Sequence, residues 1–181
     1  MADDGGAARN LAWADALAAG LSAGGVVHAV ISPGSRSTPL ALAFARHPAI
    51  GVTVLPDERC AAFFALGLGR HEARPAVFLC TSGSAVANAF PALLEAEADG
   101  VPLIVISADR PAELQQTGAN QTMDQTALFG RHVRHAVSLP APPDGDAKLP
   151  RSAGLRAAEH ARWPQPGPVH RLLWLAISHQ W

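Results

Sequence analysis

Glu58 is the residue of this sequence best suited to acid–base chemistry. It lies in the segment LPDER (residues 55–59), where a predicted strand is followed by a predicted helix. The helix dipole favours a carboxylate in the first helical turn, which is a purely structural alternative. Apolar neighbours at Phe63 and Phe64 predict a setting that would raise the pKa of this carboxyl above its usual value of about 4.3 and let it share a proton. Glu58 is therefore the candidate acid or base.

Two arginines on predicted loops are candidates for binding anions. Arg36 lies in the loop ISPGSRSTP, and Arg110 lies in the motif ADRP. A guanidinium can bind a carboxylate or a phosphate through two parallel hydrogen bonds. The alternative is a surface ion pair between each arginine and an aspartate such as Asp57 or Asp109.

Polar residues on the same loops extend the candidate site. Ser35 and Gln121 are possible hydrogen-bonding companions of the two arginines. The turn Ser82-Gly83-Ser84 resembles the nucleophile elbow of serine hydrolases, but that motif requires glycine two residues before and after the serine. Neither serine meets this requirement, so a serine hydrolase using Ser82 or Ser84 is the less favoured alternative. The phosphate-loop and GxGxxG patterns do not occur.

The elements that position these residues follow from short apolar runs. Strands are predicted at about 26–31, 51–55, 75–81, 101–108 and 133–139 and from 168, with helices at about 10–24, 39–46, 57–69, 84–98, 126–130 and 152–163. The strands are almost continuously apolar, which is typical of strands covered by helices on both faces. We therefore predict an α/β fold with a doubly wound, mainly parallel six-stranded sheet. Ligands bind beyond the carboxyl ends of such strands, so the loops carrying the candidate residues should share one edge.

Bulk properties exclude several classes of function. The 181 residues, 49% of them hydrophobic, suffice for one domain with its own core. The net charge of −1, without a basic run, argues against nucleic-acid binding. The apolar runs are too short to span a bilayer and no signal peptide is visible, so we expect a cytoplasmic protein. Cys60 and Cys80 are predicted to be buried and reduced. His132 and His135 are interpreted as a solvated or capping pair, and no metal-ligand set is predicted.

Four segments occur in a characteristic order: ISPGSRSTPLALA, LPDERCAAFFALGLGR, CTSGSAVANAFPALLEA and ISADRPAELQQTGANQTMDQ. Together they resemble the N-terminal pyrimidine-binding domain of the 2-succinyl-5-enolpyruvyl-6-hydroxy-3-cyclohexene-1-carboxylate synthases. These are the thiamine-diphosphate enzymes of menaquinone biosynthesis. The resemblance covers about residues 10–170.

The resemblance implies a role for each candidate residue. Glu58 matches the glutamate that activates the cofactor by a hydrogen bond to N1′ of its aminopyrimidine, with Ser82 and Gly83 as further cofactor contacts. The family decarboxylates 2-oxoglutarate and adds the resulting succinic semialdehyde carbanion to isochorismate. Both substrates are rich in carboxylates, and the match makes Ser35, Arg36, Arg110 and Gln121 the expected substrate contacts.

The resemblance ends at about His170. Family members continue into a domain that binds Mg2+ and the cofactor's diphosphate. We therefore expect a flexible N-terminus (1–9), a pyrimidine-binding domain (10–170) and an atypical tail (171–181), read out of frame or left by truncation of the gene. Alone, the chain is expected to show negligible turnover. It should form a homo-oligomer or join a chain that supplies the diphosphate-binding domain, and the alternative is a non-catalytic module that pairs with an intact synthase.

Overall fold

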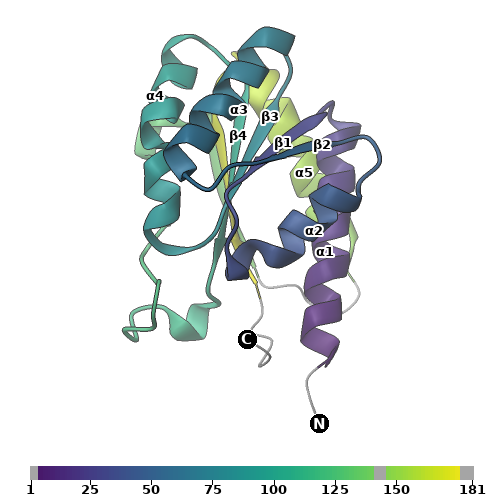
Figure 1. Ribbon diagram of the computed structural model, residues 1–181, viewed down its shortest axis with the longest axis vertical. Helices are drawn as coiled ribbons and strands as arrows, with labels where there is room; N and C mark the ends of the chain where they lie inside the picture. Colours follow the sequence, from purple (N-terminus) through teal and green to yellow (C-terminus); the bar gives the residue numbers. More distant parts are fainter. Residues whose placement is uncertain (1–3, 141–145, 176–181) are drawn as a thin grey trace.

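The computed structural model describes residues 4–140 and 146–175, and its six strands form one parallel sheet in the order β2-β1-β3-β4-β6-β5 (Figure 1). The central strands β3 and β4 are buried along their whole length, as expected where helices cover both faces. The strands are β1 (His28–Ile31), β2 (Gly51–Val54), β3 (Ala76–Cys80), β4 (Leu103–Asp109), β5 (His135–Leu139) and β6 (Val169–Trp174). The predicted doubly wound parallel α/β class is confirmed.

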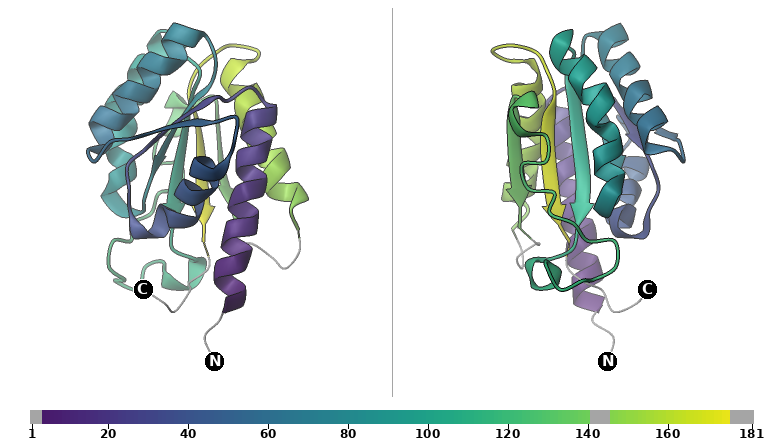
Figure 2. Two further views of the ribbon diagram at one scale, coloured as in Figure 1. Left: turned by 45° about the vertical axis from the view of Figure 1, so that its right-hand side comes forward. Right: turned by 90° about the vertical axis from the view of Figure 1, so that its left-hand side faces the viewer.

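Two helical layers enclose the sheet and divide the core in two (Figure 2). Helices α1 (Asp4–Ala23), α2 (Thr38–Arg46) and α5 (Lys148–Arg162) pack on one face, and α3 (Glu58–Glu72) and α4 (Phe90–Ala98) pack on the other. Successive strand residues point to opposite faces, so Val77 and Leu79 join the first layer while Phe78 joins the second. In the described ranges, four short 3-10 helices complete the fold: η1 (Ser35–Ser37), η2 (Gly83–Ala89), η3 (Ala112–Leu114) and η4 (Gly130–His132).

Several helix boundaries differ from the sequence prediction. Helix α1 begins at Asp4, so Asn10 lies inside it and is 4% exposed instead of capping its start. The helix predicted at 84–98 is 3-10 helical up to Ala89 and becomes α-helical only at Phe90. Pro91 explains this break, because it lacks the amide proton and is tolerated only in the first turn of an α-helix.

Two further predictions in the second half of the chain were wrong. No α-helix forms at 126–130, because Ala127 and Gly130 have positive φ values of 54° and 49°, which an α-helix cannot contain. Helix α5 begins at Lys148 instead of Ser152, with Pro150 in its first turn. Among the described residues, no helix combines the length and apolarity needed to cross a membrane.

The cysteines and the paired histidines also need correction. Cys80 is buried as predicted, but Cys60, in the first turn of α3, is exposed. His132 and His135 do not act as a pair. His132 contacts Glu97 at 2.7 Å, whereas the ring of His135 lies 4.1 Å from that of His160.

Strand β6 buries two basic residues at the point where the family resemblance ends. Arg171 is 1% exposed, and burial lowers its pKa to about 10. Its Nη1 contacts Nδ1 of His135 at 3.2 Å and donates to the carbonyl of His170 at 3.0 Å, while its Nε has no partner among the described residues. Within residues 4–140 and 146–175 no carboxylate pairs with this guanidinium, so its burial costs free energy. Residues 176–181 lie outside the described ranges.

The buried imidazole of His170 predicts loss of stability in mild acid. Burial, with a smaller contribution from Arg171, lowers its pKa from 6.5 to about 4. Between these pH values the unfolded chain binds a proton that the folded chain does not, so the free energy of unfolding should fall by roughly 3 kcal/mol as the pH drops from 6.5 to 4. Urea unfolding at several pH values measures this loss. His170→Gln should remove most of it, and an undiminished loss in that variant would contradict the assignment.

Candidate functional site

The loops after β1, β3 and β4 meet at one end of the sheet, here called the carboxyl edge (Figures 1 and 2). The chain passes from β1 to β2 on one side and then returns to β3 on the other side of β1. In parallel sheets such a reversal of strand order opens a crevice between the diverging loops. Ser32, directly after β1, connects the ends of β1, β2 and β3, since its amide donates to Leu79 O at 2.9 Å and its hydroxyl to Leu55 O at 3.0 Å.

Arg110 joins two of these loops. Its Nη1 donates a hydrogen bond to the hydroxyl of Ser82 and another to the carbonyl of Gln121, at 2.8 Å. The side-chain nitrogen Nε2 of Gln121 in turn donates to Ser82 O at 3.1 Å. The carboxylate of Asp109, which is 1% exposed, accepts a hydrogen bond at Oδ1 from the backbone amide of Arg110, at 2.8 Å. The loop after β4 is therefore fixed against the end of β3.

Arg36 brings a second positive charge to the same place. Its pKa is lowered by burial and then by the positive charge of Arg110, against an opposing effect of Asp109. Within the described residues, no carboxylate lies within 4.0 Å of either guanidinium. The surface ion pairs considered above with Asp57 or Asp109 are thus not what this structure contains. Two guanidiniums with one buried carboxylate nearby leave an excess of positive charge, which suits a ligand with carboxylate groups.

Glu58 is the first residue of α3 and faces the η2 segment. Asp57 caps the helix by accepting from the Cys60 amide at 2.8 Å, which fixes the position of Glu58. The Glu58 carboxylate is partly exposed and accepts one long hydrogen bond, 3.5 Å, from Nδ2 of Asn88. Its negative charge adds to burial in raising the pKa of the Cys80 thiol at the end of β3. The expected apolar cover is incomplete, because Phe63 and Phe64 are 41% and 46% exposed.

Two glycines allow the loops to approach this closely. A Cβ on Gly34 would lie 2.4 Å from Cβ of Thr81, so only glycine lets the Arg36 loop lie against β3. Gly83 has a φ of 76°, and a Cβ there would lie 2.9 Å from Cγ of Gln121. These contacts position Arg36 and Gln121 at the same edge.

Replacing Gly83 with alanine should therefore both destabilise the fold and displace Gln121. Backbone strain at this φ and the clash together should cost roughly 1 to 3 kcal/mol of unfolding free energy, measured by urea denaturation. Gly67→Ala is the matched control, since nothing lies within 4 Å of the added methyl group. In the interior of α3 this change should instead stabilise by about 0.5–1 kcal/mol. Equal changes in unfolding free energy in the two variants would show that the fold does not require glycine at position 83.

The structure places the other predicted residues unevenly. Ser35 and Gln121 are exposed at the carboxyl edge, as a ligand contact requires. Ser82 is fully buried, and its hydroxyl accepts a hydrogen bond from Arg110. Ser84 is exposed. In the described part of the chain no histidine forms a hydrogen bond with either hydroxyl. Neither serine is therefore arranged as an activated nucleophile.

Ser32 and Asn88 were not predicted from sequence as contacts in the site, and Asp109 was considered only as a surface ion-pair partner of an arginine. Each acts through a partner that only the fold brings near, namely Leu55 for Ser32, Glu58 for Asn88 and Arg36 for Asp109. The one available signal was the position of Asp109 directly before Arg110 in the ADRP motif.

The hydrogen-bonding groups at this edge fit the pyrimidine end of a thiamine cofactor. The Glu58 carboxylate retains free acceptor positions for a ring nitrogen, and Gly83 adds no side chain to the turn that follows β3. Among the described residues there is no group of three or more His, Cys, Asp or Glu side chains that could hold a metal ion. The described edge thus offers contacts for a pyrimidine ring but no metal-binding cluster.

Sequence comparison agrees with this chemistry. Residues 11–128 match the family described as "Thiamine pyrophosphate enzyme, N-terminal TPP binding domain", and the chain belongs to this family.

Its curated relatives include proteins named 2-succinyl-5-enolpyruvyl-6-hydroxy-3-cyclohexene-1-carboxylate synthase. The one from Dechloromonas aromatica is 52% identical over 163 residues, which cover 89% of this chain and 30% of the relative. Those from Chloroflexus aurantiacus and Chlorobium luteolum are 52% and 54% identical, over 87% and 77% of this chain and 27% and 24% of theirs. The chain thus spans about 30% or less of the length of these relatives.

Proposed function

We propose that this chain is the pyrimidine-binding part of a 2-succinyl-5-enolpyruvyl-6-hydroxy-3-cyclohexene-1-carboxylate synthase. The complete enzyme would decarboxylate 2-oxoglutarate and add the resulting four-carbon unit to isochorismate, in menaquinone biosynthesis. One observation carries the proposal: Glu58 and the pair Arg36 and Arg110 lie at the same carboxyl edge, around Ser82 and Asn88. The identity of about 50% to the synthases named above supports it.

In this proposal Glu58 controls a proton on the cofactor. Thiamine diphosphate supplies the electron sink for decarboxylation and carbon–carbon bond formation. The Glu58 carboxylate holds the proton at N1′ of the aminopyrimidine, from the fixed start of α3. Asn88 orients that carboxylate from η2, and Ser82 and Gly83 border the pyrimidine at the end of β3.

Arg36 and Arg110 bind the substrates' carboxylates, with Ser35 and Gln121 as hydrogen-bonding companions. Arg110 is already oriented by its bonds to Ser82 and Gln121, so little freedom is lost when a carboxylate binds. Arg36 is half-buried and has no hydrogen-bond partner among the described residues. Mg2+ and the diphosphate group would be held by a separate diphosphate-binding region, in the same assembly.

The surface of the second helical layer supports assembly with other chains. Phe63 and Phe64 on α3 and Leu94 on α4 are 41%, 46% and 41% exposed, and the two helices pack side by side (Figure 1). We name these three residues the α3–α4 patch. Exposed aromatic and aliphatic side chains on adjoining helices are typical of an interface. The same patch would serve the alternative function, a non-catalytic module that pairs with an intact synthase.

We predict that the isolated chain self-associates through the α3–α4 patch. The double variant Phe63→Gln, Phe64→Gln should weaken association at least tenfold, about 1.4 kcal/mol, in sedimentation velocity at increasing concentration. Leu155→Gln on α5 is the matched control, since Leu155 is 37% exposed on the opposite layer. A wild-type chain that stays monomeric at the highest concentration would rule out this interface.

A fusion enzyme tests the proposed function. Residues 1–170 of this chain replace the corresponding segment of the Dechloromonas aromatica synthase, and release of CO2 from 2-oxoglutarate is measured with thiamine diphosphate, Mg2+ and isochorismate. The fusion should catalyse the release of CO2, and the isolated chain should not. Calorimetric titration of the cofactor and Mg2+ should likewise detect binding to the fusion only. A folded fusion that binds the cofactor but consumes neither substrate would refute the proposed reaction.

A further inference from the structure

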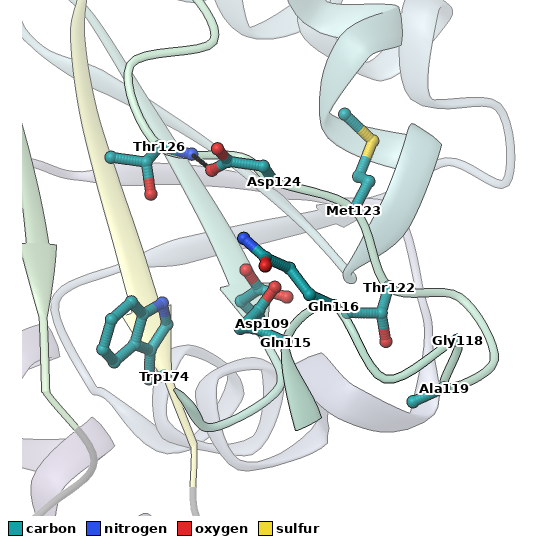
Figure 3. Close-up of a pocket in the computed structure, with 10 residues that line it drawn as sticks. All are labelled: Asp109, Gln115, Gln116, Gly118, Ala119, Thr122, Met123, Asp124, Thr126 and Trp174. Atoms are coloured by element: carbon teal, nitrogen blue, oxygen red, sulfur yellow. Dashed lines mark hydrogen bonds between the residues drawn. The ribbon is translucent and has the colours of Figure 1, made fainter. Parts of the chain in front are cut away.

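The loop after β4, here called the Arg110 loop (residues 110–125), has few apolar contacts to hold it in place. Within this described range only Pro111 and Gln125 are buried. A pocket of about 340 Å3 lies between the loop and the ends of β4 and β6 (Figure 3). Segments with so little buried apolar surface open more easily than the rest of a fold. Other interactions must therefore fix the conformation of this loop.

The backbone of the Arg110 loop is also strained. Gln116 and Gln121 have φ values of 60° and 56°, in the left-handed region that residues with a side chain seldom adopt. Such conformations persist only where the surrounding contacts impose them. Without those contacts the loop would relax, and Gln121 would leave the position from which it donates to Ser82 O.

The carboxylate of Asp109 joins the two ends of the Arg110 loop. Asp109 is the last residue of β4, and besides the backbone amide of Arg110 it accepts hydrogen bonds from the side chains of Gln115 and Gln125. Figure 3 shows Asp109 and Gln115 side by side. Burial raises the pKa of this carboxyl, and the three hydrogen bonds oppose the rise because they favour the charged form. One buried carboxylate thus binds the first, a middle and the last residue of the loop. We name Asp109, Gln115 and Gln125 the Asp109 network.

The Asp109 network is connected to the residues that face a ligand. Gln121 lies between Gln115 and Gln125 in the chain, and its carbonyl accepts a hydrogen bond from Arg110 Nη1 at 2.8 Å. When a binding site is ordered for only part of the time, the apparent affinity falls by the fraction of molecules in which it is ordered. A network that keeps the loop ordered therefore strengthens binding without touching the ligand.

We propose that Asp109 is a positioning residue, whose hydrogen bonds hold Arg110 and Gln121 in place before a carboxylate substrate binds. The charge and the hydrogen bonds of Asp109 act in opposite directions on such a substrate. Loss of the negative charge leaves the site more positive and strengthens the binding of an anion, whereas loss of the hydrogen bonds frees the loop and weakens it. The ordering of the loop stands on the structure alone, and the effect on the substrate rests on the proposed function.

Hydrogen exchange of the full chain tests the ordering of the loop. Asp109→Asn still offers one oxygen to the Arg110 amide, but its own amide group now faces the donors of Gln115 and Gln125. The backbone amides of Leu114 and Gln115, which are hydrogen-bonded inside the loop, should exchange roughly tenfold faster in this variant. The amides of β1 and β3 should exchange at the parent rate.

Two further variants separate the hydrogen bonds from the charge. Gln125→Met removes a donor of the network at a fully buried position, keeps the charge of Asp109 and should also speed the exchange of the loop. Asp124→Asn is the matched control, because it removes a negative charge from an exposed position of the same loop and keeps an oxygen for the Thr126 amide. It should leave the exchange rates within about twofold. Equal rates in all three variants would contradict the proposed network.

Kinetics of the fusion enzyme test the effect on the substrate. Asp109→Asn and Gln125→Met should each raise the KM for the substrate that Arg110 holds roughly tenfold, with kcat within about threefold of the parent. Asp124→Asn should change neither value. A lower KM in Asp109→Asn would show that this residue acts only through its charge, and it would overturn the proposal. Faster exchange of the loop with an unchanged KM in both variants would overturn it as well. A parent fusion without activity would refute the proposed reaction, and the exchange rates alone would then decide whether the network orders the loop.

Discussion

Glu58→Gln in the fusion enzyme should lower kcat about 10²- to 10⁴-fold, the usual contribution of a positioned acid or base. Glutamine has nearly the same shape and can still contact a ring nitrogen, but it cannot take up or release a proton. Glu58 lies at the capped start of α3, where Asp57 fixes the first turn, so the change should not disturb the fold. The rate of CO2 release at saturating 2-oxoglutarate and cofactor measures the effect.

The matched control is Glu95→Gln, which removes an exposed carboxylate from α4. This variant should retain the kcat of the fusion within a factor of two or so, since surface changes usually have small effects. If Glu58→Gln loses no more activity than Glu95→Gln, then Glu58 is a first-turn carboxylate with a structural role only.

Arg110→Met should raise the KM for a carboxylate substrate roughly 100-fold, about 2.7 kcal/mol. The loss has two causes. The variant lacks the guanidinium that pairs with the substrate, and it also lacks the bonds that tie Ser82 to the Gln121 loop. Steady-state kinetics with 2-oxoglutarate and isochorismate varied in turn identifies the substrate that Arg110 holds.

Arg110→Lys provides a sharper comparison. Lysine keeps the charge but has no planar fork, so it should recover only a small part of the lost affinity. Arg131→Met, at an exposed position on η4, should leave both KM values unchanged. KM values within threefold of the parent in Arg110→Met would mean that this arginine only braces the loop.

The sheet was predictable because its strands are short apolar runs separated by turn residues. Residues such as Val77, Phe78 and Leu79 are apolar in succession since helices cover both faces of β3. The errors arose where backbone details decide the outcome. Pro91 delays the start of α4, and positive φ at Ala127 prevents a helix that the composition allows. Cys60 was misplaced because one turn of amphipathic pattern does not define which side of α3 is buried.

The candidate site was predictable to the level of its loops. Parallel topology alone brings Arg36, Glu58 and Arg110 to one edge. The contacts between them were not predictable, because the bond from Asn88 to Glu58 joins residues 30 positions apart.

A crystal structure of the fusion enzyme with thiamine diphosphate and Mg2+ would test the central claim most directly. We predict a carboxyl oxygen of Glu58 within about 2.6–3.0 Å of a ring nitrogen of the aminopyrimidine, with Arg36 and Arg110 on the substrate side of the cofactor. A bound cofactor whose pyrimidine lies away from the start of α3, with Glu58 directed into solvent, would contradict it.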